Sequence, residues 1–123
     1  MLKHMRLMLE NLPPTLRDQA ETIRKCLEAF QQVMPLQAVY LFGSHARGNA
    51  RPDSDVDLCL VSEGAERQLD AAAKFRRAMW GIWPRPSFTL VPIAPRRLSE
   101  KKARGDHFFT TVLAEGIRLV AEN

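Results

Sequence analysis

Cysteine is scarce in this sequence, and long apolar runs are missing. The chain has 123 residues and two cysteines, Cys26 and Cys59. They form no CxxC pair and have no histidine at metal-site spacing, so we expect both to be buried small hydrophobic residues. No apolar stretch approaches the roughly 20 residues that cross a bilayer, and the first residues carry too much charge for a signal peptide. We therefore expect a cytoplasmic protein with no membrane contact.

Aromatic residues are also few, at 7% of the chain, and they do not interleave with the basic ones. The formal net charge of +4 favours polyanionic partners, either nucleotides or nucleic acids. Proteins that bind nucleic acid strands commonly combine a basic groove with aromatic platforms, whereas Lys and Arg are spread along this chain. We therefore expect a nucleotide as the partner and do not expect nucleic acid.

The length is that of one domain, which we assign to residues 1–123, with residues 1–12 as an N-terminal extension. Helical spacing of Leu69, Ala73, Arg76 and Trp80 predicts a helix over 65–80 that connects two strands. The other predicted helices cover 16–34, 44–47, 96–104 and 107–114, and the predicted strands cover 38–42, 55–61 and 87–93. Residues 117–120 form either a final strand or a packed tail. A crossover helix between strands indicates the α/β (α+β) class, with one mixed sheet and flanking helices.

The N-terminal extension carries an apolar face. Its members are Met1, Leu2, Met5, Leu9 and Leu12. Such a face either contacts a partner or a second copy of the chain, or packs on its own domain. The sequence leaves both alternatives open.

The most informative stretch runs from Leu41 to Val61. A predicted strand ends at Gly43-Ser44, where a short helical turn would offer backbone N–H groups and a hydroxyl to a phosphate, with Arg47 one turn later. Asp55 and Asp57 stand two residues apart at the next strand, so both carboxylates project from one face. Paired carboxylates are ligands that Mg²⁺ prefers. We expect His45, between these groups, to be exposed and to take no part.

This stretch resembles the signature of the DNA polymerase β-like nucleotidyltransferase superfamily. The matching residues are Gly43-Ser44-x-x-Arg47-Gly48 and Ser54-Asp55-x-Asp57-Leu58. In a chain this short, the resemblance is to the minimal nucleotidyltransferases. It implies the polymerase β-like fold and transfer of a nucleotidyl group, AMP from ATP in the first instance, to a hydroxyl acceptor. It also implies Asp55 and Asp57 as catalytic ligands of Mg²⁺ or Mn²⁺, and Gly43, Ser44, Arg47 and Ser54 as the nucleotide-binding residues.

Relatives of this size are often encoded beside a helical HEPN-type protein, as the antitoxin of a toxin–antitoxin pair. The resemblance therefore implies a possible helical partner of that type, and a homodimer is the other association that we consider. Neither follows from the residues themselves.

One position departs from the family pattern. A third carboxylate would come from the strand over 87–93, but Thr89 stands there, on the face that carries Ser87 and Val91. A threonine hydroxyl is a poor Mg²⁺ ligand and no general base at neutral pH, and loss of acid–base help costs about 10²- to 10⁴-fold in rate. Two interpretations remain: a nucleotidyltransferase, or a catalytically degenerate fold that acts as a nucleotide- or protein-binding module.

Overall fold

A mixed sheet of five strands forms the centre of the computed structural model, which describes residues 5–122. The strands are β1 (Met5–Leu7), β2 (Ala38–Phe42), β3 (Val56–Val61), β4 (Phe88–Ile93) and β5 (Ile117–Glu122), in the spatial order β1-β5-β2-β3-β4. β3 and β4 are parallel, and every other neighbouring pair is antiparallel. The predicted mixed sheet is confirmed, and residues 117–120 belong to a strand instead of a packed tail.

Helices connect and cover these strands. The α-helices are α1 (Ala20–Val33), α2 (Ser44–Arg47), α3 (Gln68–Ala78), α4 (Pro95–Ala103) and α5 (His107–Glu115), and two 3-10 segments, η1 (Leu9–Asn11) and η2 (Pro14–Gln19), precede α1. The helix predicted over 16–34 is thus α-helical only from Ala20, because Pro14 starts a tighter 3-10 segment first. α3 makes the crossover between the parallel strands β3 and β4, as expected.

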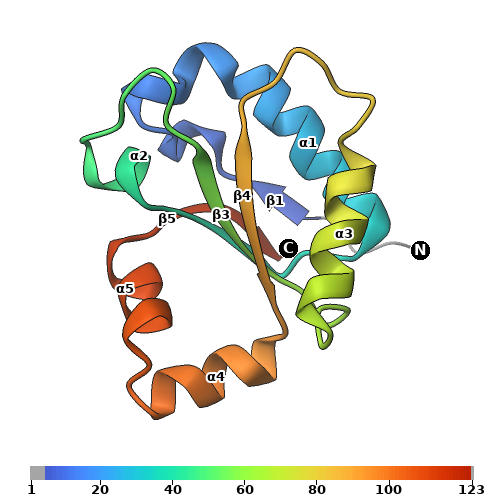
Figure 1. Cartoon of the computed structure of the whole chain (residues 1–123), viewed down its shortest axis with the longest axis vertical. Coiled ribbons are helices and arrows are strands. Elements are labelled where there is room, and N and C mark those ends of the chain that lie inside the picture. The colour runs from blue at the N-terminus through green and yellow to red at the C-terminus, as the bar shows by residue number, and fades with distance from the viewer. Residues whose placement is uncertain (1–4, 123) are drawn as a thin grey trace.

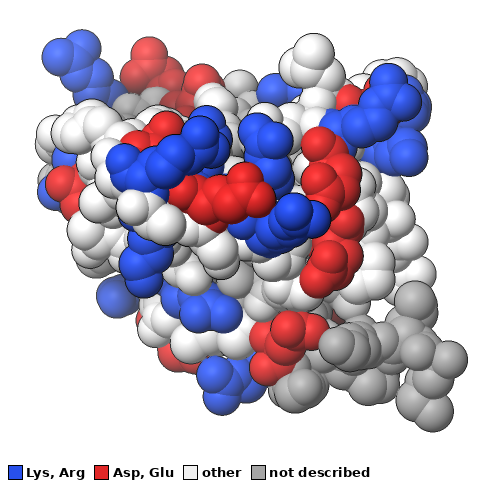
Figure 2. All heavy atoms as spheres, turned by 90° about the horizontal axis from the view of Figure 1, so that it is seen from below, with Lys and Arg blue, Asp and Glu red and all other residues white. Residues whose placement is uncertain are grey.

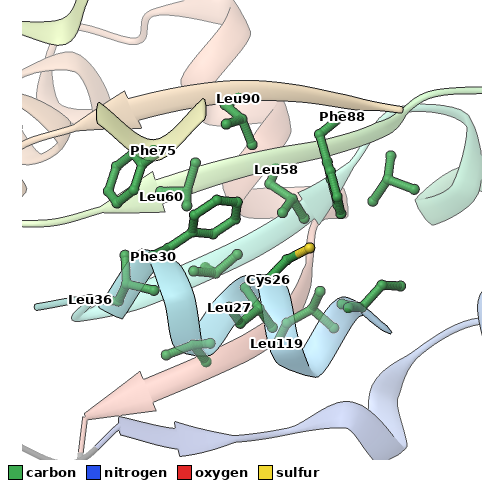
Figure 3. Close-up of a cluster of buried hydrophobic side chains, with 14 of the residues drawn as sticks. Cys26, Leu27, Phe30, Leu36, Leu58, Leu60, Phe75, Phe88, Leu90 and Leu119 are labelled. Atoms are coloured by element: carbon green, nitrogen blue, oxygen red, sulfur yellow. The ribbon is translucent and has the colours of Figure 1, made fainter. Parts of the chain in front are cut away.

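The main core lies between one face of the sheet and the helices α1 and α3 (Figures 1 and 3). Phe30 of α1 meets Phe75 of α3 and Phe88 of β4 edge to face, with ring centroids 5.3 and 6.4 Å apart. Cys26 is fully buried in this cluster, and burial raises the pKa of its thiol. Edge-to-face pairs of this kind fix helix positions against a sheet.

The face of α3 that packs inward carries Ala71 and Phe75. Ala71 and Phe75 are buried, whereas Leu69 is 89% exposed and Trp80 is 70% exposed. The helix was correctly predicted, but the side chains whose spacing predicted it lie on its solvent side. Phe75 takes the inward position because it fills the space against Phe30.

The opposite face of the sheet carries a smaller cluster under α5 and α4 (Figure 1). Cys59 of β3 is fully buried there with Phe109 and Val112 of α5. Burial raises the pKa of the Cys59 thiol to about 12, so it stays protonated at neutral pH. Both cysteines are free and buried, which confirms the sequence-based expectation.

The N-terminal segment takes part in the sheet and the core. Met5–Leu7 pairs with β5, Leu12 is 1% exposed, and Met5 and Leu9 pack against the main cluster. Met1 and Leu2, the other members of the predicted apolar face, lie outside the described residues. Within residues 5–122, no helix combines the length and apolar character needed to cross a membrane.

Candidate functional site

Three strand ends meet at one edge of the sheet and bring the predicted site residues together. β2 ends at Phe42, and its antiparallel partner β3 begins beside it, so that Phe42 pairs with Asp57. β4 starts at the same edge, and Asp57 pairs in turn with Thr89. Phe42, Asp57 and Thr89 therefore form a row across the sheet, with Asp55 just before β3.

The side-chain alternation along β3 is as predicted. Val56, Leu58 and Leu60 are buried on the face covered by α1 and α3. Asp57 and Asp55 project from the opposite face. The predicted register of Thr89 is also confirmed, because its hydroxyl donates a long hydrogen bond, 3.4 Å, to Asp55 Oδ2. Thr89 thus occupies the space that a third carboxylate would fill.

The two carboxylates differ in their surroundings. Asp55 is exposed and Asp57 is half-buried. Burial raises the pKa of Asp57, and the hydrogen bond from the Thr89 hydroxyl opposes this rise. The nearby Asp55 carboxylate raises the pKa further, whereas His45 and Arg47 lower it. Among residues 5–122, no Lys or Arg forms an ion pair with either carboxylate. Arg47 and His45 act on Asp57 only from a longer range, where they lower its pKa, so a cation bound directly to the carboxylates would supply the closer counter-charge.

The two carboxylates suit Mg²⁺ or Mn²⁺, which also take ligands from water and substrate. They do not suit a metal ion whose ligands all come from the protein. The described part of the chain contains no group of three His, Cys, Asp or Glu side chains arranged around a metal position. Mg²⁺ is commonly held by one or two carboxylates and completes its shell with water and substrate phosphates. Two carboxylates at an open sheet edge fit that pattern.

Gly43 lies directly against Asp57. Its φ of +75° falls in the region that favours glycine, and a Cβ at this position would overlap Asp57 Oδ2. From here the chain turns into α2, where Arg47 N donates to Gly43 O at 3.0 Å, and Gly48 ends the turn with φ +82°. The sequence folds this way because only glycine allows both the backbone angle and the close approach.

We expect Gly43→Ala to weaken metal binding as well as stability. The backbone strain should cost about 1–3 kcal/mol of unfolding free energy, and the new methyl group should displace the Asp57 carboxylate. Gly105→Ala is the matched control, because Gly105 also has a positive φ, +70°, but open space around it. Denaturant unfolding and Mn²⁺ titration of both variants measure the two effects. Equal Mn²⁺ affinity in the two variants would contradict the displacement of Asp57.

His45 is not the exposed bystander that the sequence suggested. It is 5% exposed and contacts Thr15 Oγ1 through Nδ1 at 2.9 Å and the Ser54 carbonyl oxygen through Nε2 at 3.3 Å. A carbonyl can only accept, so a proton belongs on Nε2, and in that tautomer Nδ1 accepts from the Thr15 hydroxyl. His45 thus joins η2, α2 and the turn before Asp55. No local sequence pattern predicts the contact between His45 and Thr15, because the two residues lie 30 positions apart in the chain.

Thr15→Val should destabilise the protein, because it deletes the hydroxyl with little change in shape and leaves the His45 Nδ1 without its partner. An unsatisfied buried polar group costs about 1–3 kcal/mol. Thr15→Ser keeps the hydroxyl and should stay within about 0.5 kcal/mol of the unmodified protein. Urea unfolding compares the two variants, and an equal loss in both would mean that the methyl group, not the hydrogen bond, matters.

Ser54 is the predicted site residue whose hydroxyl is already engaged. Its Oγ accepts from the Arg51 N–H at 2.8 Å and so closes the turn before β3. It lines a pocket of about 460 Å³ with Thr15, Leu16 and His45, on the α1 side of the sheet. The structure therefore separates Ser54 from the face that carries Asp55 and Asp57.

Other acidic residues do not replace the missing carboxylate. Asp53 lies in the turn and lines the same α1-side pocket as Ser54. Glu63 follows the far end of β3 and contacts Gln37, and Asp106 caps α5 by accepting from Phe109 N at 3.0 Å. Thr89 is thus the residue that faces the pair from β4.

A second pocket, of about 380 Å³, joins the site to α5. One wall carries Gly43, Arg47 and Asp57, and the facing wall is the side of α5 that carries Phe108. The remaining lining residues are Phe42, His107, Thr111, Val112 and Glu115. Sequence reasoning missed the α5 residues because the helix has no motif of its own, and only the fold brings it to this edge.

The comparison with family models agrees with the residue signature. The family model described as "Nucleotidyltransferase domain" matches residues 23–102, more than half of the chain. A crystal structure of a proposed nucleotidyltransferase from Sulfolobus solfataricus is similar in fold, with a TM-score of 0.53, 20% identity, and coverage of 85% of this chain and 81% of that chain. A proposed minimal nucleotidyltransferase is 28% identical over 91% of this chain and 96% of that chain, with a TM-score of 0.47. The comparison with curated proteins gives no match.

Proposed function

This chain belongs to the nucleotidyltransferase domain family, and from that premise we propose that it binds a nucleoside triphosphate with Mg²⁺ or Mn²⁺ and transfers the nucleotidyl group to a hydroxyl acceptor. ATP is the first candidate, with AMP as the transferred group. The observation that carries the proposal is the pair Asp55 and Asp57, which forms no direct ion pair with Lys or Arg among the described residues, beside the backbone of Gly43.

In this proposal, each predicted site residue has its own role in binding metal or phosphate. Divalent metal ions, when bound, would hold the attacking and leaving oxygens and neutralise charge on the phosphates. Asp55 and Asp57 would hold the metal, and Gly43 would let the backbone approach the triphosphate without a Cβ in the way. Ser44 at the start of α2 can donate to a phosphate oxygen, and Arg47 can offset phosphate charge. Ser54 acts by shaping the turn that carries Asp55.

Thr89 supports a second candidate function. Because its hydroxyl is the group from β4 that faces Asp55, no carboxylate from that strand can accept the proton of the attacking hydroxyl. A protein with this site would hold nucleotide and metal but transfer slowly, or act as a nucleotide- or protein-binding module. The two candidates share the binding step and differ in the rate of transfer.

Isothermal titration calorimetry tests the shared step. Titration of ATP into the protein with Mg²⁺ or Mn²⁺ should release heat that disappears with EDTA, and the other nucleoside triphosphates establish base preference. Absence of metal-dependent heat with all of them would overturn the proposal. Incubation with labelled ATP and candidate acceptor proteins then separates the transferase from the binding module.

For partners, we propose association with a helical HEPN-type protein, as antitoxin of a toxin–antitoxin pair, or with a second copy of the chain. The resemblance to minimal nucleotidyltransferases supports the former. Co-expression with a helical protein encoded next to this chain, followed by size-exclusion chromatography, tests it. Basic and acidic side chains alternate on the face seen in Figure 2, so this face gives little support to nucleic acid as a partner.

A further inference from the structure

The pocket between α2 and α5 has a wall that the phosphate- and metal-binding residues do not explain. Gly43, Arg47 and Asp57 line one side, and five residues of α5 complete it. Its volume of about 380 Å³ lies within the range of about 300–1,000 Å³ that is usual for small-molecule pockets. The size suits a compact ligand, and the position is directly adjacent to the proposed triphosphate site.

The wall on α5 presents an aromatic ring that is exposed and yet fixed. Phe108 is 43% exposed, one of few large apolar side chains with that exposure among the described residues. Its ring stands edge to face against Phe42, with centroids 5.4 Å apart, and against Phe109 at 4.9 Å. Two ring contacts restrict its rotation, so little side-chain entropy would be lost on binding a flat ligand.

Hydrogen-bonding groups flank this ring on the same side of α5. His107, Thr111 and Glu115 recur at four-residue spacing, and all three line the pocket. An imidazole, a hydroxyl and a carboxylate offer both donors and acceptors, as the edge of a nucleobase and the hydroxyls of a ribose require. An aromatic platform with such groups beside it is a usual arrangement for a nucleobase.

We propose that this pocket receives the nucleoside part of the triphosphate, with the base against Phe108, and that α5 is therefore the specificity element of the site. This inference rests on the proposed function, since it places the triphosphate along Gly43 and Arg47. The hydroxyl acceptor then approaches from the β4 side, past Thr89. Thr89 is not among the residues that line the pocket with α5.

The larger pocket is not an equivalent alternative. Ser54 and Val56 line it, and they alternate with Asp55 and Asp57, so it opens on the α1 side of the sheet. A nucleoside in that pocket would lie on the other face of β3 from the carboxylates. Of these two pockets, the one at α5 includes Gly43, Arg47 and Asp57 in its lining.

The test compares ATP with inorganic tripolyphosphate, which has the phosphates but no nucleoside. In the presence of Mn²⁺, the unmodified protein should bind ATP more tightly than tripolyphosphate. Phe108→Ala should weaken ATP binding about 10-fold, about 1.4 kcal/mol, and leave the tripolyphosphate affinity within about twofold. Phe108→Tyr, which keeps the ring, should restore ATP binding. Trp80→Ala is the control, because Trp80 is exposed but distant in the fold from this pocket.

The outcomes separate this inference from the function on which it rests. If ATP and tripolyphosphate bind the unmodified protein equally, or if Phe108→Ala weakens both alike, the nucleoside is elsewhere and the inference is overturned while triphosphate binding stands. If neither ligand binds, the proposed function is overturned as well. The comparison of ATP with tripolyphosphate uses the unmodified protein. It therefore tests the inference even if Phe108→Ala does not fold.

Discussion

Replacement of both carboxylates, in Asp55→Asn with Asp57→Asn, is expected to abolish the metal-dependent heat of the proposed nucleotide binding and to leave the thermal unfolding temperature unchanged or higher. The two effects have one cause. In the proposed function the carboxylates are the protein's metal ligands, and without a cation the exposed Asp55 repels the half-buried Asp57. Amides of the same shape remove both the ligation and the repulsion. Calorimetry and thermal unfolding of the same sample measure the two effects together.

The stability gain should depend on pH with a definite sign. Burial raises the pKa of Asp57 in the folded protein above its unfolded value, so ionisation disfavours the folded state. This penalty is absent below the unfolded pKa of about 4 and is complete above the folded pKa. The advantage of the double variant should therefore be present at pH 7 and vanish as the pH falls toward about 4. A lower unfolding temperature for the variant at pH 7 without metal would contradict this account.

We expect Thr89→Asp to raise the rate of the proposed nucleotidyl transfer at least 10-fold, about 1.4 kcal/mol of barrier. The Thr89 hydroxyl already reaches Asp55 Oδ2, and the strand register sets Thr89 opposite Asp57, so a carboxylate here joins the other two. It would add a metal ligand and accept the proton from the attacking hydroxyl. Nucleotide affinity should change less than the rate, because the added group acts mainly in the transition state. Single-turnover transfer from labelled ATP measures the rate.

Thr89→Asn is the matched control for this variant, since it has the shape of aspartate without the charge. It should leave the transfer rate near that of the unmodified protein. Thr89→Asp should also lower the unfolding temperature without metal, through repulsion among three carboxylates, and recover it when Mn²⁺ is added. A fast unmodified protein that Thr89→Asp does not improve would show that another group supplies the third function.

The sequence predicts best where the signal lies within one strand or turn. The alternation along β3 separates Asp57 from Val56 and Leu58, and parity along β4 places Thr89 beside the carboxylates, because both depend on the two-residue repeat of a strand. Backbone geometry at Gly43 is equally local.

Features that depend on distant contacts could not be predicted in the same way. Exposure of His45 was wrongly predicted, because its burial depends on Thr15 in another segment. The helical spacing of Leu69 and Trp80 predicted α3 but not its buried face, because that face is set by the contact between Phe75 and Phe30 of another helix. Phe108 reaches the site only because α5 folds back over β2.

The pairing of β1 with β5 has a consequence for how the protein folds. Met5 lies opposite Glu122, so closing this part of the sheet joins segments that are far apart along the chain. β5 must also enter between β1 and β2. Such long-range closure is entropically costly and slows folding, whereas β2, α2, β3, α3 and β4 follow one another in the sequence. The edge that carries Gly43, Asp57 and Thr89 can therefore assemble as a contiguous unit before β5 completes the sheet.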